Sequence, residues 1–270
     1  MSFFASISVT SYNRKELTEY CIKSIIENTP RENFELVVVD NQSADGTIDI
    51  LNKMYSNKMI DKLIINQQDS LLGTAINLAW KESCPRSKWL ITFSNDHFVM
   101  NEWFANLNRV VKDEGLQYAL CHLLMPSYSP DGRQVIKTPS GGKYLRKRET
   151  DKFIFGGGLA LRRDIYKKYK IQFIENPRKN SPFSVMCVQL SQMNLKGIEL
   201  AKPCSLQQDS DWNNPAYREY YEQVFSKRGV DGYGMNGYGM KVLCQHQRDG
   251  YTPYVKEYYA GTNYLNEKNH

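Results

Sequence analysis

Ile7-Ser8-Val9-Thr10-Ser11-Tyr12-Asn13-Arg14 is one of two stretches that decide the fold, and Val37-Val38-Val39-Asp40-Asn41-Gln42-Ser43-Ala44-Asp45-Gly46-Thr47 is the other. In each stretch an apolar run stops at a polar tip, and apolar residues at helical spacing lie between the two stretches. This order predicts a β-α-β unit. Its chemistry is expected at the carboxyl ends of parallel strands, where open α/β sheets bind ligands.

The rest of the first half continues this alternation of strands and helices. Asn13 and Glu16 have the spacing of a capping box, and they predict the start of a helix that ends before Pro30. Thr47 is expected to cap the next helix. Further strands are predicted at residues 34–39, 62–65 and 88–93, and a further helix at residues 74–83. Right-handed crossovers between the strands place their polar tips along one edge of the sheet.

The second half is less regular. Its patterns predict strands at residues 118–124, 153–161 and 198–201, and helices at residues 163–169 and 183–195. Residues 126–142 are predicted to be a loop with a hairpin at Asp131-Gly132. We see no linker between independent domains, so we expect one α/β domain over residues 1–212. Residues 213–270 are expected to form an irregular, aromatic-rich C-terminal extension packed on that domain.

The composition is that of an ordinary globular protein. The chain has 270 residues, of which 41% are hydrophobic and 24% are charged. No apolar run approaches the length of a membrane helix, and the first residues lack the pattern of a signal peptide, so we expect a cytoplasmic protein. The six cysteines show no C-x-x-C spacing. The absence of C-x-x-C spacing favours free buried thiols over a disulfide framework or a metal cluster.

The formal net charge is +6, and basic residues crowd into residues 143–152 and 162–170. These segments are either a solvated surface or a surface that attracts a polyanion, nucleic acid included. The tyrosines beyond Asp211 either pack the tail onto the domain or stack on an acceptor.

The opening stretches and the motifs after them resemble the family-2-like glycosyltransferases of the GT-A fold. The resemblance implies a Rossmann-type, mostly parallel sheet flanked by helices, with a nucleotide-diphosphate sugar as donor. It also implies the residues that hold the nucleotide, which are Thr10, Tyr12, Asn13, Arg14, Asp40, Asn41, Asn66, Gly73 and Asn95. Asn77 belongs to the same motif as Asn66 and Gly73. Taken on the residues alone, Asp40 is alternatively a cap for the turn that follows it.

A short polar motif, Ser94-Asn95-Asp96, stands in the place of the family's acidic metal motif. By the resemblance, Asp96 is a metal ligand and a catalytic residue, and Asn95 bonds the ribose. Asp209 falls where the family places a metal-binding His, or it is a solvated acidic turn. Mn²⁺ or Mg²⁺ is the expected cofactor, since these ions take oxygen ligands and bridge to a diphosphate.

Gly156, Gly157 and Gly158 resemble the family's Gly-Gly segment beneath the donor sugar, where small residues let the backbone approach the sugar closely. The family's Glu-Asp pair, whose Asp is the general base, is missing from its region. The candidates for the base are therefore Glu175, Asp209 and Asp211, unless the mechanism needs none.

The predicted function is that of a metal-dependent, inverting glycosyltransferase with a nucleotide-sugar donor, UDP-linked by preference. The expected acceptor is a saccharide. One alternative is transfer to hydroxylated bases of DNA, which the basic segments favour. The others are a catalytically inactive protein that binds nucleotide sugars, and a nucleotidyltransferase. Against the last, no glycine-rich loop with Lys or Arg follows the first strand.

Overall fold

The computed structural model describes residues 4–114, 120–122, 133–147 and 158–174. Between residues 183 and 207 it describes residues 183, 186, 189, 190, 192, 193, 195, 197–200 and 205–207. All of these except Gln207 belong to one compact unit, formed by residues 1–176 and 180–206. The predicted boundary at residue 212 and the predicted C-terminal extension lie outside the described residues.

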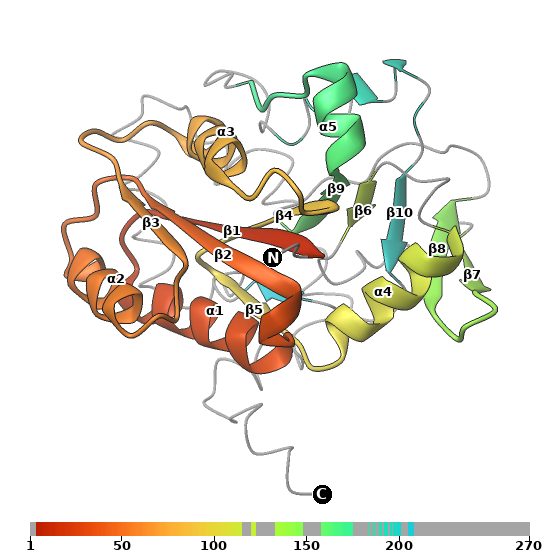
Figure 1. The fold of residues 1–270 in the computed structure, drawn as a ribbon, viewed down its shortest axis with the longest axis horizontal. Coiled ribbons are helices and arrows are strands. Elements are labelled where there is room, and N and C mark those ends of the chain that lie inside the picture. Colours follow the sequence, from red (N-terminus) through yellow and green to blue (C-terminus); the bar gives the residue numbers. More distant parts are fainter. Residues whose placement is uncertain are drawn as a thin grey trace, which may run out of the picture. The chain divides into compact units, whose positions relative to one another are not determined.

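The first half alternates strands and helices as predicted (Figure 1). Its elements are β1 (Ala5–Ser11), α1 (Lys15–Asn28), β2 (Phe34–Asp40), α2 (Thr47–Ser56), β3 (Lys62–Ile65), α3 (Leu72–Glu82), β4 (Trp89–Ser94), β5 (His97–Val99) and α4 (Trp103–Glu114). The second half adds β6 (Leu120–His122), β7 (Arg133–Lys137), β8 (Lys143–Lys147), β9 (Leu159–Arg162), α5 (Arg163–Tyr169), β10 (Gly197–Leu200) and β11 (Ser205–Gln207).

Nine strands form one mixed sheet in the order β3-β2-β1-β4-β9-β6-β10-β8-β7. The first four of these strands are parallel, which confirms the predicted Rossmann-type core. β9 runs antiparallel to both β4 and β6, and the sheet continues as a mixed one beyond it. β5 and β11 form a separate two-stranded sheet.

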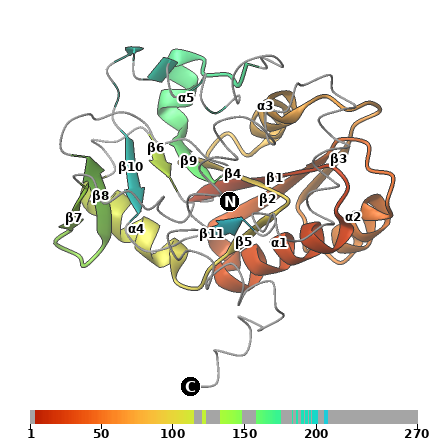
Figure 2. The ribbon, with the colours of Figure 1, turned by 180° about the vertical axis from the view of Figure 1, so that it is seen from behind.

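Helices cover both faces of the large sheet (Figures 1 and 2). One core lies between the sheet and α1, α2 and α4, and it includes Ile25, Leu51 and Trp103. A second core lies on the other face, where Ile76 of α3 and Ile165 of α5 are buried. Every residue of β2 is buried, as expected for a strand covered on both faces. Within the described part of the chain, no helix is both long and apolar enough to cross a bilayer.

The predicted capping box at the start of α1 is wrong. The helix begins after Arg14, whose φ of 62° is left-handed, and no side chain caps it. The Asn13 side-chain oxygen instead accepts a hydrogen bond from Ala44 N at 2.8 Å. The Asn13 side chain bonds to the loop after β2, which is distant in sequence. A rule based on local spacing cannot predict such a partner.

The predicted cap of α2 is also displaced by one residue. Thr47 is the first residue of the helix, and Gly46 precedes it with a φ of 86°, a conformation that glycine adopts without steric cost. Asp45 serves both neighbouring helices. Its Oδ2 accepts from Lys15 N at 3.0 Å, and its Oδ1 accepts from Thr47 N at 3.1 Å. One carboxylate therefore satisfies a backbone donor at the start of α1 and another at the start of α2.

The predicted loop over residues 126–142 is wrong in its later part. Residues 133–137 form β7, which pairs with β8 across a turn closed by Thr138 N and Gly142 O at 2.8 Å. β7 is short and carries charged residues at both ends, so it lacks the apolar alternation that identifies a strand. The predicted hairpin turn at Asp131-Gly132 lies outside the described residues.

A buried polar cluster lies where β1, β2 and β4 begin. Arg163 is 5% exposed, and its guanidinium donates to Ser6 Oγ at 3.1 Å, Ser83 Oγ at 2.8 Å and Ser87 Oγ at 2.6 Å. Ser6 Oγ in turn donates to Glu35 Oε1 at 2.5 Å. The sequence placed Arg163 within a basic surface segment, but its charge is held inside the domain because serines surround it.

Candidate functional site

The carboxyl ends of β1, β2 and β4 lie in register, so the polar residues after them meet. Ser11 pairs with Asp40, and Thr10 pairs with Ser94. Backbone bonds extend this alignment past the strand ends: Asn41 N donates to Ser11 O at 2.8 Å, and Asn95 N donates to Thr10 O at 3.1 Å. Three predicted segments are thereby brought to one edge of the sheet.

Two successive residues after β1 adopt left-handed backbone conformations. Asn13 has a φ of 54° and Arg14 a φ of 62°. Such conformations cost roughly 1–2 kcal/mol per non-glycine residue, and they persist where the surroundings hold them. Here Asn13 N donates to Ser43 Oγ at 2.7 Å, and Asn13 O accepts from Asn95 Nδ2 at 2.8 Å. The turn is thus fixed from the loops after β2 and β4.

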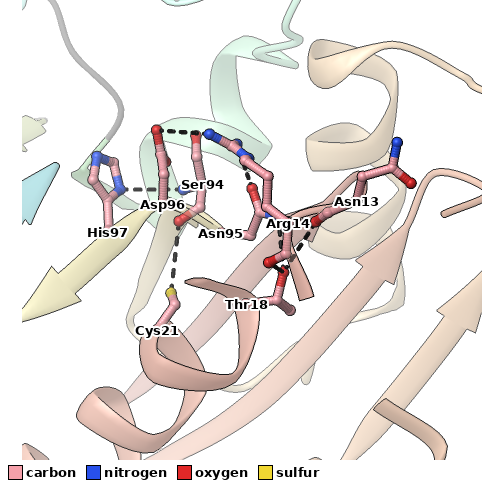
Figure 3. A network of polar contacts seen from close by, with 8 residues as sticks. All are labelled: Asn13, Arg14, Thr18, Cys21, Ser94, Asn95, Asp96 and His97. Carbon is pink, nitrogen blue, oxygen red and sulfur yellow. Dashed lines mark hydrogen bonds and ion pairs between the residues drawn. The ribbon is translucent and has the colours of Figure 1, made fainter. Parts of the chain in front are cut away.

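This turn directs the Arg14 side chain toward the end of β4 (Figure 3). Arg14 Nη2 donates to Asn95 Oδ1 at 2.6 Å, and Nη1 lies 3.5 Å from Asp96 Oδ2. Asn95 and Asp96 are each 2% exposed, whereas the Arg14 side chain is 13% exposed. The guanidinium therefore lies between a buried amide and a buried carboxylate, and it neutralises the charge of the carboxylate.

The Asn95 side chain bonds to several groups that hold the turn at Asn13 and Arg14 in place. Its Nδ2 donates to Thr18 Oγ1 at 2.8 Å as well as to Asn13 O, while its Oδ1 accepts from Arg14. Thr18 Oγ1 donates onward to Arg14 O at 3.0 Å. The sequence prediction singled out Asn95 but missed Thr18. Its spacing of four residues after Arg14, on a predicted helix, was the available signal.

Buried groups support this network from below. Cys21 is fully buried, as predicted, and its thiol donates to Ser94 O at 3.6 Å. Burial raises the pKa of the Cys21 thiol, so the group stays protonated. His97 is 1% exposed, and burial lowers its pKa. A neutral imidazole agrees with its role in the turn, where Nδ1 accepts from Ser94 N at 3.2 Å.

Asp40, at the end of β2, is fully buried and is engaged by Ser43. Its Oδ1 accepts from Ser43 N at 2.8 Å, and its Oδ2 accepts from Ser43 Oγ at 2.6 Å. This is the turn-capping geometry that the residue type alone allows. Because each carboxylate oxygen can accept more than one bond, contact with a nucleobase stays a prediction for Asp40.

Asn41 and Asn66 meet beside Asp40. Asn66 Nδ2 donates to Asn41 Oδ1 at 2.8 Å, and Ser70 Oγ donates to the same oxygen at 2.8 Å. Asn41 Nδ2 donates to Leu71 O at 3.2 Å, just before α3. Ser70 was not predicted, because it lies in a polar loop without periodicity.

The remaining predicted residues fall into two groups. Gly73 is buried in the first turn of α3, and Gly158 is buried just before β9. Asn77 holds the backbone at Phe173 through a reciprocal pair, with Nδ2 donating to Phe173 O at 2.8 Å and Oδ1 accepting from Phe173 N at 2.9 Å. Outside the described residues lie Gly156, Gly157, Glu175, Asp209 and Asp211.

The chemistry of the donor set bears on the expected metal ion. Among the described residues, no three His, Cys, Asp or Glu side chains are grouped around one point. Asp96 is the single carboxylate at the tip of β4, and it is buried beside Arg14. Mg²⁺ is commonly held by one or two carboxylates together with substrate phosphates. The site therefore fits a divalent ion that binds together with a diphosphate.

Comparison with known proteins agrees with this geometry. Poly(ribitol-phosphate) beta-glucosyltransferase of Bacillus spizizenii (strain ATCC 23059 / NRRL B-14472 / W23) is 35% identical over 101 residues, which cover 36% of this chain and 15% of the relative. A crystal structure of S. aureus TarS 1-349 superposes with a TM-score of 0.59 at 14% identity and covers 99% of this chain and 77% of that one.

The mannosyltransferase PcManGT from Pyrobaculum calidifontis, solved in complex with GDP-Man and Mn²⁺, gives a TM-score of 0.60 at 16% identity. That match covers 96% of this chain and 74% of that one. At such identities these structures establish the fold alone. The model of Glycosyl transferase family 2 matches residues 6–170. The chain therefore belongs to glycosyl transferase family 2 and has the GT-A fold expected from its strand-end motifs.

Proposed function

We propose that this protein transfers a sugar from a nucleotide-diphosphate donor, UDP-linked by preference, to an acceptor hydroxyl, with inversion at the anomeric carbon. The observation that carries the proposal is the meeting of Arg14, Asn95 and Asp96 at the carboxyl ends of β1 and β4. The guanidinium there would bind a diphosphate leaving group, and the carboxylate would hold the divalent ion that accompanies the diphosphate. Donor binding at this edge also agrees with the general position of ligands in open α/β sheets.

The proposed leaving group requires positive charge beyond that of the Arg14–Asp96 pair. The Asp96 carboxylate and the Arg14 guanidinium sum to zero, and their N–O separation is 3.5 Å. We propose that Asp96 and Asp209 would hold an added Mn²⁺ or Mg²⁺. The ion would supply two positive charges to offset the negative charge that develops on the diphosphate. We propose that Arg14, whose terminal nitrogens each carry a second N–H beyond the one directed to Asn95 or Asp96, donates hydrogen bonds to phosphate oxygens, as planar guanidinium groups do.

The nucleoside is proposed to lie across the ends of β1 and β2. Thr10 is 5% exposed, and its hydroxyl has no hydrogen-bond partner in the part of the chain that the structure describes. A buried hydroxyl at a strand end is a suitable contact for a donor oxygen or nitrogen. Asp40, Asn41 and Asn66 provide carboxylate and amide groups next to it, and Tyr12 provides a half-buried ring for stacking.

An inverting reaction also needs a base that removes the proton of the acceptor hydroxyl. The attack is in line, so the base must lie on the opposite side of the sugar from the diphosphate. We propose that Glu175, Asp209 or Asp211 supplies it. Gly156, Gly157 and Gly158 would leave room for the donor sugar beneath it.

For the acceptor, we propose a hydroxyl of a saccharide or polyol polymer that carries phosphate. The relative at 35% identity bears poly(ribitol-phosphate) in its name, and the net charge of +6 suits a polyanion. The alternative acceptor predicted from the sequence, hydroxylated bases of DNA, is tested by measuring duplex binding. Nucleic acid as a partner would give duplex binding that weakens steeply with salt.

Calorimetry with UDP, GDP and CDP, each with and without Mn²⁺, tests the proposal. We expect UDP to bind most tightly and Mn²⁺ to strengthen the binding. The absence of binding by all three nucleotides would refute the donor site. Donor hydrolysis that requires Mn²⁺ would exclude an inactive binding protein. Pyrophosphate release from a nucleoside triphosphate and a sugar phosphate would instead identify a nucleotidyltransferase.

A further inference from the structure

A groove of about 750 Å³ lies at the opposite end of the strands from the donor site. It is lined by residues at the start of β4, by α4, and by the junction of β9 and α5. We propose that this groove is a second subsite that binds a remote, phosphate-bearing segment of a polymeric acceptor. The inference rests on the proposed function for its biological role, but the binding itself is independent of the donor site.

The charge of the groove supports an anionic ligand. Among the described residues, five basic residues and one acidic residue line it, namely Lys88, Lys112, Arg162, Arg163, Lys167 and Asp164. The acidic residue is already ion-paired with Arg162. Arg163 is 5% exposed, and the buried serines and Glu35 hold its charge inside the domain, so it adds little to the charge at the surface of the groove. The positive charge that faces the groove is therefore that of the exposed lysines Lys88, Lys112 and Lys167.

Lys88 and Lys112 are the cations best placed to bind a ligand. Both side chains are exposed, Lys88 just before β4 and Lys112 on α4. Neither takes part in a hydrogen bond or an ion pair with any other described residue. By contrast, Lys167 Nζ donates to Pro85 O at 3.1 Å. A phosphate bound by Lys88 and Lys112 would therefore displace no hydrogen bond or ion pair between these ammonium groups and another described residue, and the one electrostatic partner that Lys112 has is the neighbouring Asp113 on the same helix.

The apolar part of the wall suits the carbon skeleton of such a polymer. Phe4 and Val111 are partly exposed in the groove and pack against the sheet core. Trp89 also lines it but is 2% exposed, so its ring is not available for base stacking. The volume lies within the range of about 300–1,000 Å³ that is typical of ligand sites. A single flexible chain fits these features better than a nucleic-acid duplex.

The position of the groove predicts a dependence on acceptor length. β4 has 6 residues between the groove and the donor site. At about 3.3 Å per residue, this is roughly 20 Å. Only an acceptor long enough to span this separation can occupy both places and gain from linked binding. A single repeat unit cannot.

Binding of fluorescent linear polyphosphate to the full chain, followed by anisotropy at several salt concentrations, tests the subsite. The test variant is Lys88→Glu with Lys112→Glu. The matched control is Lys53→Glu with Lys81→Glu, which makes the same change of net charge at exposed positions on α2 and α3. We expect at least a tenfold loss of affinity and a shallower salt dependence in the test variant, and less than a twofold loss in the control.

Equal losses in the two variants would overturn the inference, because they would show a general charge effect. Anionic vesicles and duplex DNA are two further probes that identify the ligand class. If the groove bound either of them in preference to polyphosphate, the inference would also be overturned. Thermal unfolding of both variants checks that they fold. UDP calorimetry on the unmodified chain tests the donor site separately. If UDP did not bind, the donor site would be refuted, but a difference in polyphosphate affinity between the two variants would still support the subsite.

Discussion

Arg14 Nη1 lies 3.5 Å from Asp96 Oδ2, although the two residues follow different strands of the sheet. The pair forms because β1 and β4 are adjacent and parallel, and because the left-handed turn at Asn13 and Arg14 aims the guanidinium across their ends. The pair joins the cation proposed to bind the diphosphate to the carboxylate proposed to bind the metal ion.

Replacing Arg14 by Ala should weaken UDP binding by about 10- to 100-fold, since hydrogen bonds to charged groups contribute roughly 1.5–3 kcal/mol. The variant also leaves the negative charge of Asp96 close to the diphosphate. Arg14→Lys should fall between, because an ammonium keeps the charge but not the planar fork. Calorimetry measures the change, and Lys23→Ala, on the exposed face of α1, is the control for a lost charge. UDP affinity within twofold of the unmodified protein would exclude Arg14 from the donor site.

Asp96→Asn keeps the shape of the side chain and removes its charge. We expect Mn²⁺-stimulated donor hydrolysis to fall by roughly 100-fold or more, a loss typical of groups that stabilise transition-state charge. Initial rates over a range of Mn²⁺ concentrations provide the measurement, with Asp113→Asn on α4 as the control. If the Asn variant retained its response to Mn²⁺, the metal would have to be held elsewhere.

Asp40→Ala should raise KM for the donor more than it lowers kcat, because the nucleoside end of the donor does not react. Ser43→Ala should lower the free energy of unfolding by about 1–3 kcal/mol, since Asn13 N and Asp40 both lose a buried partner. Steady-state kinetics and urea unfolding measure the two effects. An unchanged KM in the Asp40 variant would leave that residue with turn capping alone.

Asp45 should make stability depend on acid pH. Burial alone would raise the pKa of Asp45, but hydrogen bonds from Thr47 and from Lys15 N outweigh it and lower the pKa. The unfolded chain then takes up the proton first as pH falls. The stabilisation is present above the ordinary carboxyl pKa of about 4 and is lost as pH falls through the folded value.

Urea unfolding measured from about pH 7 to about pH 3 tests this dependence. Asp45→Asn should be less stable at neutral pH and should show a flatter acid limb than the unmodified protein. Asp164→Asn, on the exposed start of α5, is a control for the loss of one carboxylate. The same acid slope in the Asp45 variant and the unmodified protein would assign the dependence to other groups.

The sequence by itself determined the strands of the parallel core and the edge at which the polar residues gather. Strands covered on both faces are continuous apolar runs, so β2 and β4 could be read with their polar ends. The parallel connection then requires those ends to share one edge. The resemblance to the family rested on the same residues, because the order of motifs along the chain can be read without knowing which side chains are in contact.

Only the tertiary structure decided which polar groups pair within that edge. The bond from Ala44 N to Asn13 Oδ1, the bond from Asn13 N to Ser43 Oγ and the ion pair of Arg14 with Asp96 all join segments that are far apart in sequence. Likewise, Arg163 reads as a surface charge in its own segment, yet it is buried and bonded to three serines from β1 and from the connection between α3 and β4. Periodicity reports which face a residue prefers, whereas a polar side chain finds its partners only after packing has brought the strand ends together.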